Sequence, residues 1–218
     1  TCGPTCLHAV YSYYGDQVPL KQIIQEIKPL ETGGTLAVSM ANHALKRGYD
    51  AVIYTYNLLI FHPSWFRADA KVDLAERLRA QKATKTDRKV QAATRLYLEF
   101  LNRGGTMAYE DLRPSLIRRY LKQGIPILTG LSATYLYGCP REFDDSYDDV
   151  RGAPVGHFVV LSGYDKRKRE VEVADPFLEN PRFGRSYYRV PLERLIASIL
   201  LAIVTYDANL LILTPRKR

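Results

Sequence analysis

The sequence has 218 residues, of which 46% are hydrophobic, and its formal net charge is +8. This length and composition predict a single domain, residues 1–218, with one substantial core. The longest apolar run, near residues 195–204, is too short and too interrupted for a membrane span. Three cysteines are too few for a disulfide framework, and they suit a reducing compartment, which favours the cytoplasm.

A cysteine at the head of the first predicted helix is a candidate nucleophile. Cys2 stands directly before Gly3-Pro4, and Pro4 fits the first helical turn because its missing N–H costs nothing there. The unpaired N–H groups and partial positive charge of a helix N-terminus favour the thiolate, which is the reactive form. Gly15 is expected to end this helix. The alternative is a buried structural cysteine. The spacing predicts these inward-facing residues: Leu7, Val10, Tyr11 and Tyr14.

The segments that follow alternate between helix and strand. Their apolar spacing and turn residues predict helices over residues 18–28, 35–46 and 112–122, and strands over residues 49–57, 106–109 and 125–132. In the first of these helices, we expect Leu20, Ile23, Ile24 and Ile27 on one face. Thr35, which follows a turn at Gly33-Gly34, is expected to cap the second.

Two middle segments are candidates for functional additions. A long helical stretch begins at Pro63, breaks near residues 84–86 and ends at Gly104-Gly105. We interpret residues 58–105 as a helical insertion that covers a cleft or contacts a partner. Residues 133–154 are predicted to form a long loop, and loops of this length are usually functional. We expect it to be a wall or lid of the active cleft. Two roles are open for its acidic residues: they attract a basic substrate, or they are ordinary solvated residues of a loop. These residues are Asp144, Asp145, Asp148 and Asp149.

Of the four histidines, His157 is the best candidate for a general base. It opens a predicted buried strand that includes residues 158–161, and the preceding Gly156 allows another backbone or a substrate to approach closely. The alternative is a hydrogen-bonded histidine at a sheet edge. The other three histidines have structural explanations. His8 lies within the first predicted helix, His43 lies in a later one, and His62 is expected at a helix cap.

Asp175 is placed to orient that histidine. It follows a short alternating strand, residues 171–173, and the charged segment 165–169 predicts an antiparallel hairpin between the two strands. His157 and Asp175 lie about equally far from the tip, so the hairpin brings them to the same end. Cross-strand neighbours at such a register are roughly 5 Å apart. The alternative is that Asp-Pro only starts a turn.

The last part of the chain completes the predicted fold. It predicts a strand over residues 186–190, a helix from Leu192, and strands over residues 202–206 and 210–213. The fold class is therefore α+β, with N-terminal helices packed on a C-terminal antiparallel sheet.

Together these motifs resemble the peptidase C39-like family, a branch of the papain-like cysteine peptidases. The likeness rests on the Cys-Gly-Pro-x-Cys-Leu helix start, the Gly-His-Phe-Val-Val strand and the Ala-Asp-Pro turn, in that order. It covers the beginning and the last third of the chain. The resemblance implies a papain-like fold in which Cys2 is the nucleophile, His157 is the base and Asp175 orients the base.

The resemblance also implies a glutamine a few residues before the nucleophile, whose side chain helps form the oxyanion hole. The sequence begins one residue before Cys2, and Gln17 and Gln22 lie past the first helix. Either the glutamine precedes Thr1, or the site has one donor fewer, which typically costs about 100- to 1,000-fold in rate. The backbone N–H of Cys2 remains as a donor. Thr1 as an N-terminal nucleophile is the alternative to Cys2.

We therefore predict a cysteine peptidase or amide hydrolase that cuts a peptide or protein substrate through a thioester acyl-enzyme. Two alternatives keep the same fold: an acyltransferase with an amine or thiol acceptor, and a non-catalytic peptide-binding module. No CxxC or HxxxH spacing supports a metal site, so we expect no metal and no cofactor. Solvated helix faces explain the basic residues, so nucleic acid is not an expected partner.

Overall fold

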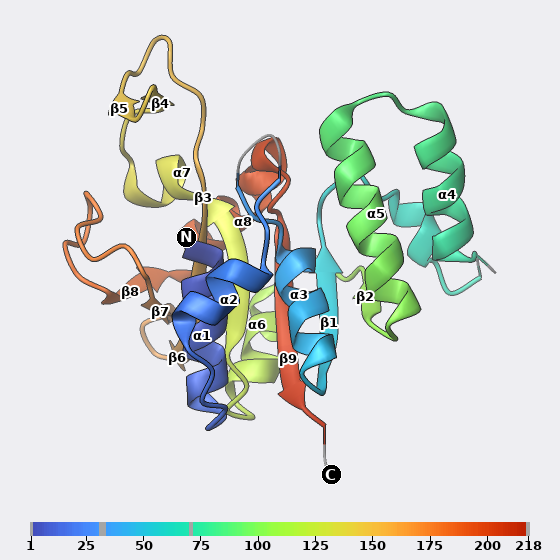
Figure 1. The fold of residues 1–218 in the computed structure, drawn as a ribbon. Helices are drawn as coiled ribbons and strands as arrows, with labels where there is room; N and C mark the ends of the chain where they lie inside the picture. Colours follow the sequence, from blue (N-terminus) through green and yellow to red (C-terminus); the bar gives the residue numbers. More distant parts are fainter. Residues whose placement is uncertain (1, 31–33, 70–71, 217–218) are drawn as a thin grey trace.

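A seven-stranded sheet runs through the centre of the computed structural model, which describes residues 2–30, 34–69 and 72–216 (Figure 1). The strand order is β2-β1-β9-β3-β6-β7-β8, and neighbouring strands are antiparallel except for β1 and β2, which are parallel. The strands are β1 (Tyr49–Thr55), β2 (Thr106–Ala108), β3 (Ile127–Ser132), β6 (Gly156–Asp165), β7 (Glu170–Ala174), β8 (Tyr187–Pro191) and β9 (Asn209–Pro215).

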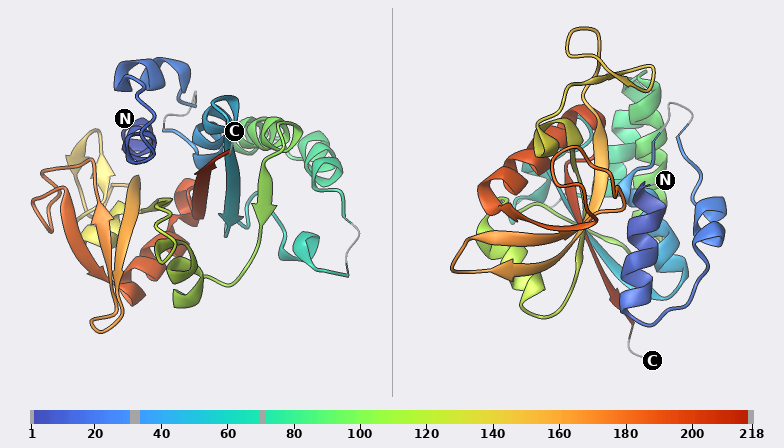
Figure 2. Two further views of the ribbon diagram at one scale, coloured as in Figure 1. Left: turned by 90° about the horizontal axis from the view of Figure 1, so that it is seen from below. Right: turned by 90° about the vertical axis from the view of Figure 1, so that its left-hand side faces the viewer.

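Helices cover both faces of this sheet (Figure 2). One face packs against α1 (Cys2–Tyr13), α2 (Leu20–Glu26), α3 (Ala37–Lys46) and α5 (Arg88–Asn102), and the other against α6 (Pro114–Leu121) and α8 (Leu192–Leu201). Alternate side chains of β6 enter the two cores, with Phe158 and Val160 on the α1 face and Val159 and Leu161 on the α8 face. The α+β fold class is confirmed, and a strand buried on both faces explains the continuous apolar run after His157.

Helix α1 begins at Cys2 and lies against the sheet as predicted. Its start is tightly packed, because a Cβ atom on Gly3 would lie 3.1 Å from Met40 Sδ in α3. Gly15 adopts a φ of 78°, a left-handed conformation that ends the helix. The inward-facing residues are buried or, for the last, half-buried: Leu7, Val10, Tyr11 and Tyr14.

The predicted helical insertion contains two α-helices, and the expectation of a long helix from Pro63 is wrong. Pro63–Phe66 is a single 3-10 turn, η1, and the described residues between it and Asp73 are not helical. Helix α4 (Leu74–Thr84) begins where the Asp73 carboxylate accepts hydrogen bonds from two backbone N–H groups. The predicted break is confirmed, because Asp87 caps α5 by accepting from the Val90 N–H.

The prediction of a strand over residues 202–206 is also wrong. Residues Ala202–Thr205 form a 3-10 turn, η2, that prolongs α8. Leu195, Ile199 and Ala202 are fully buried at helical spacing, so the apolar run continues the inward stripe of the helix rather than alternating as a strand would.

Two expectations near the N-terminus also differ from the structure. Thr35 does not cap α3, since Leu36 occupies the N-cap position without a side-chain hydrogen bond. Gly33 lies outside the described residues. Ile24 is exposed rather than inward-facing, because α2 is short and only Ile23 among its residues is buried.

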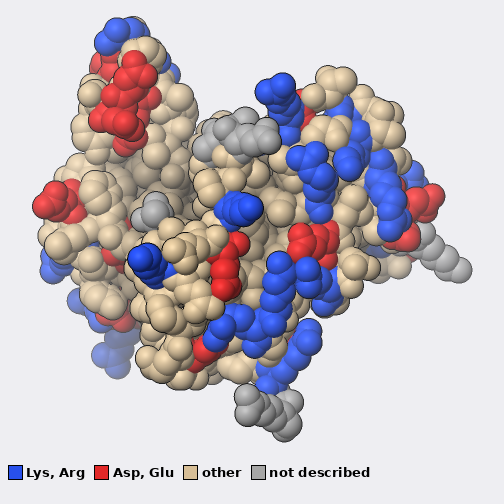
Figure 3. Space-filling view, viewed as in Figure 1, with Lys and Arg blue, Asp and Glu red and all other residues tan. Residues whose placement is uncertain are grey.

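The segment predicted as a long loop is a folded lobe that projects beyond the end of the sheet (Figure 1). It contains α7 (Ala133–Tyr137) and a small hairpin of β4 (Glu142–Phe143) and β5 (Ser146–Tyr147). Figure 3 shows acidic side chains grouped on this lobe, whereas Lys and Arg side chains spread over α4 and α5. The lobe and the helical insertion therefore carry charges of opposite sign.

Candidate active site

Cys2 is the first residue of α1, and its thiol contacts the His157 imidazole. Burial raises the pKa of the thiol, but the hydrogen bond to His157 and the charge of that ring outweigh it, so the pKa is below its ordinary value. The N-terminus of α1 acts in the same direction, because its partial positive charge favours a thiolate. Cys2 is therefore set up as an activated thiol.

His157 is the second residue of β6 and is largely buried, with 11% of its side chain exposed. Its Nε2 lies 2.8 Å from Asp175 Oδ1, which leaves Nδ1 as the ring nitrogen for Cys2. Burial lowers the pKa of the ring, but the hydrogen bonds to Asp175 and Cys2 raise it to about 9. A ring with this pKa carries a proton at neutral pH, and its positive charge favours the thiolate form of Cys2.

Asp175 follows β7, and its side chain is fully buried. Oδ1 accepts hydrogen bonds from the His157 ring and from the backbone N–H of Phe177, 2.8 Å away in each case. Oδ2 accepts from the hydroxyls of Tyr137, at 2.7 Å, and Tyr188. Burial raises the pKa of the carboxyl, but these donors and the positive charge of His157 outweigh it and keep the pKa below its usual value.

The two tyrosines that hold Asp175 were missed by the sequence reasoning. Tyr137 ends α7 and Tyr188 lies on β8. The chain has 16 tyrosines, and neither of these two belongs to a motif. The one available signal was strand alternation, which places Tyr188 inward and its neighbour Tyr187 outward.

The predicted hairpin is present, but its register differs from the expected mirror placement. The pairing of β6 with β7 ends at Val160 and Ala174, and a bulge interrupts it between Leu161 and Gly163. Asp175 thus lies beyond the last pair, while His157 lies three residues before Val160. The two side chains meet because they reach across this open end of the hairpin, not as a directly opposed pair.

Gly156 allows a close approach, as its position before His157 suggested. A Cβ atom there would lie 2.6 Å from Asp207 Oδ2 and 2.7 Å from Thr205 Oγ1. Asp207 is itself buried, and Oδ1 has no hydrogen-bond partner among the described residues. Burial raises the pKa of its carboxyl to about 7. The approaching groups belong to the protein's own turn before β9, which packs behind the start of β6.

A pocket of about 260 Å³ opens beside the thiol. Cys2 and His157 line it together with three aromatic side chains, Tyr137, Tyr147 and Phe177, and one carboxylate, Glu142. The lobe that follows β3 contributes five of the residues that line the pocket, so it forms a wall of the candidate site, as its position before His157 predicted.

The model of the Peptidase_C39 like family matches residues 1–197. The chain belongs to the peptidase C39-like family. The match covers the Cys-Gly-Pro helix start, the Gly-His strand and the Asp-Pro turn, so the resemblance read from these motifs is confirmed. No curated protein matches the chain at a significant level.

Two solved structures align with this C39-like chain over nearly its whole length. One is a double glycine motif protease from an AMS/PCAT transporter in complex with the leader peptide, with 15% identity, a TM-score of 0.43, and coverage of 99% of this chain and 84% of that one. The other is a C39-like peptidase from Bacillus anthracis, with 16% identity, a TM-score of 0.47, and coverage of 100% and 90%.

Cys6, His43 and His62 of this C39-like chain are held by hydrogen bonds outside the contacts between Cys2, His157 and Asp175. The Cys6 thiol is buried and donates to the Phe158 carbonyl at 3.2 Å, and burial raises its pKa. His43 is buried between Tyr11 and Glu26, and His62 accepts from the Ser64 N–H at the start of η1. Cys139 lines the pocket beside Cys2. The alternative nucleophile Thr1 lies outside the described residues.

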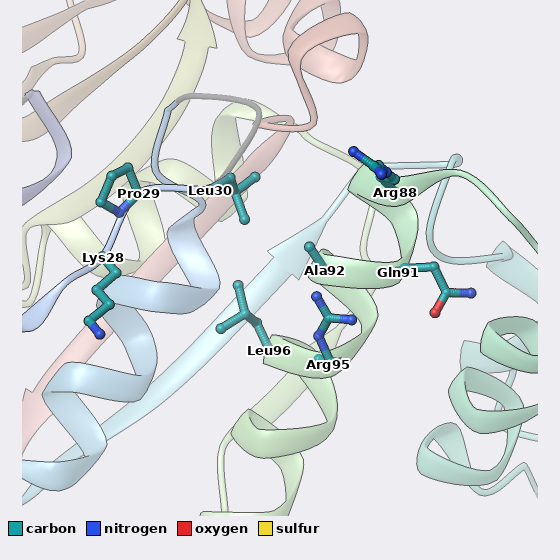
Figure 4. Close-up of a pocket in the computed structure, with 8 residues that line it drawn as sticks. All are labelled: Lys28, Pro29, Leu30, Arg88, Gln91, Ala92, Arg95 and Leu96. Atoms are coloured by element: carbon teal, nitrogen blue, oxygen red, sulfur yellow. The ribbon is translucent and has the colours of Figure 1, made fainter.

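A cavity of about 560 Å³ lies away from the candidate site, between the segment before α3 and helix α5 (Figure 4). Lys28 stands on one side of it and Arg88 and Arg95 on the other. Cys2, His157 and Asp175 do not line it. Among the described residues, no group of His, Cys, Asp and Glu side chains is arranged to hold a metal ion, and no helix is long and apolar enough to cross a membrane.

Proposed function

We propose that this C39-like protein is a cysteine peptidase in which Cys2, His157 and Asp175 form the catalytic triad. One observation carries the proposal: the three side chains make an unbroken chain of contacts at the edge of a pocket. A peptide substrate fits this arrangement, because an activated thiol next to a protonated imidazole is suited to acyl transfer from an amide.

The reaction begins from the ion pair of the Cys2 thiolate and the His157 imidazolium. The sulfur attacks the carbonyl carbon of the scissile bond, and the carbonyl oxygen takes the negative charge. In this proposal the backbone N–H of Cys2 donates to that oxygen, and the N-terminus of α1 stabilises the charge.

His157 then gives its proton to the departing amine, and a thioester remains on Cys2. In the second half, the neutral imidazole removes a proton from water, and the resulting hydroxide attacks the thioester carbonyl. The acid product leaves, the C–S bond breaks, and the thiolate–imidazolium pair returns. Asp175 keeps the ring oriented with Nδ1 toward the sulfur throughout.

The test is cleavage of a mixed peptide library by the purified protein and by its Cys2→Ala variant. In water enriched in ¹⁸O, each new C-terminal carboxylate should gain one ¹⁸O atom, because water resolves the acyl-enzyme. Cleavage that persists in the Cys2→Ala variant would refute the triad. Products that carry an added amine instead of ¹⁸O would identify an acyltransferase.

A further inference from the structure

The hairpin β4–β5 puts one carboxylate into the pocket that holds the thiol. Glu142 lines this pocket with Cys2 and His157, and the other walls are aromatic or small and apolar. The backbone of Glu142 is held on both sides. It pairs with Tyr147 in the hairpin, and its N–H and carbonyl exchange hydrogen bonds of 3.1 and 2.9 Å with Ala153. The side chain therefore projects from a fixed point.

The Glu142 carboxylate has no counter-ion of its own. Among the residues that the structure describes, it takes part in none of the ion pairs. The nearby arginines of the lobe are engaged elsewhere: Arg141 donates to the carbonyls of Asp149 and Val150, and Arg151 pairs with Asp148 at 2.6 Å. A cation from outside would thus find an unpaired charge.

The charge of Glu142 acts inside the pocket. After burial, it is one of the causes that raise the pKa of the Cys139 thiol and of the Tyr147 hydroxyl, and both of these residues line the pocket. Because Tyr147 stands opposite Glu142 in the hairpin, an aromatic ring and a carboxylate lie on the same wall of the pocket. Aromatic faces and a carboxylate together favour a cation on an apolar stem.

We infer that Glu142 makes this pocket a subsite for a lysine or arginine side chain of the peptide, next to the scissile bond. The inference rests on the proposed function and adds the substrate class to it. The aliphatic part of the side chain packs against Tyr137, Tyr147 and Phe177, and its charged end pairs with Glu142. The acids at the hairpin tip do not line the pocket, so they serve as controls.

Thiol reagents of opposite charge test the inference without knowledge of the substrate. Two methanethiosulfonates with the same ethyl arm carry either a trimethylammonium or a sulfonate group. In each case the Cys2 thiolate attacks the sulfenyl sulfur, forms a mixed disulfide and releases methanesulfinate. The rate of modification at Cys2 is followed by peptide mass spectrometry, which separates it from Cys6 and Cys139.

The ratio of the cationic to the anionic rate should fall about tenfold in Glu142→Gln, the effect of losing a charge interaction of about 1.4 kcal/mol. Asp145→Asn is the matched control, because it removes one charge from the same hairpin. Asp145 has a φ of 58°, which asparagine tolerates well. Its ratio should change less than twofold. An unchanged ratio in Glu142→Gln, or an equal fall in both variants, would overturn the inference.

The outcomes separate the inference from the proposed function. Slow modification of Cys2 by both reagents, at the rate of Cys6, would contradict the activated thiol. The ratio of the cationic to the anionic rate would still test the role of Glu142. In the peptide library, lysine or arginine should be enriched beside the cut, and Glu142→Gln should remove the enrichment. Efficient cleavage without that enrichment would contradict the inference about Glu142 but would agree with the proposed peptidase activity.

Discussion

The Tyr137 hydroxyl lies 2.7 Å from Asp175 Oδ2, so the carboxylate that faces His157 is also held from the lobe after β3. Tyr188 donates to the same oxygen from β8. The oxygen Oδ1 is left for the ring and for one backbone N–H. Hydrogen bonds from three separate parts of the chain thus fix the orientation of the carboxylate that holds the His157 ring.

Tyr188→Phe should weaken catalysis through Asp175. Loss of a hydroxyl donor raises the pKa of this buried carboxyl toward its usual value, so the acid limb of the pH–rate profile should move to higher pH. The free energy of unfolding should fall by about 1–3 kcal/mol, because Oδ2 loses a donor. Urea titration and peptide cleavage measure the two effects. Tyr187→Phe, on the same strand but 68% exposed, is the control and should change neither.

Iodoacetamide should alkylate Cys2 much faster than Cys6 at neutral pH. The pKa of Cys2 is lowered and that of His157 is raised to about 9, so the thiolate is present over the whole range between them. Cys6 is buried, and burial raises its pKa. Peptide mapping after brief exposure measures both sites. Slow labelling at both, or a Cys2 rate that rises only near pH 9, would show that the thiol is not activated.

Asp175→Asn should move the alkaline limb of the pH–rate profile to lower pH. The hydrogen bond to Asp175 is one cause of the raised pKa of His157, so a neutral partner lets the imidazolium lose its proton earlier. Activity at neutral pH should fall by about 10- to 100-fold, since the ring loses its orienting charge as well. An alkaline limb that stays near pH 9 would mean that Asp175 does not act on the ring.

Asp207→Asn should stabilise the protein at alkaline pH. The pKa of Asp207 in the folded state is about 7, above the ordinary value of about 3.9. The folded state therefore holds the proton more tightly, and stability is lost as pH rises from about 4 to 7. The free energy of unfolding of the Asp207→Asn variant should exceed that of the unchanged protein by on the order of 2 kcal/mol at pH 8, and by less at pH 5. Urea midpoints at the two pH values measure this, and a gain that is equal at both would contradict it.

The helix start and the hairpin could be predicted because their signals are local. Gly3-Pro4 after Cys2 marks a helix N-terminus, and two apolar strands around a charged tip mark a hairpin. The same local logic failed at residues 202–206, where an apolar run fits a strand or a helix equally well. There, burial of Ala202 beneath the end of α8 decided the outcome.

The sequence alone determined the α+β class, the family and the three candidate catalytic residues, because each depends on short patterns within one or two neighbouring elements. Only the tertiary structure decided which groups surround them. Tyr137 reaches Asp175 across 38 positions, and Glu142 enters the pocket of Cys2 through a lobe that the sequence presented as a loop. Such contacts depend on how distant elements pack, and a pattern of neighbouring residues carries no record of that packing.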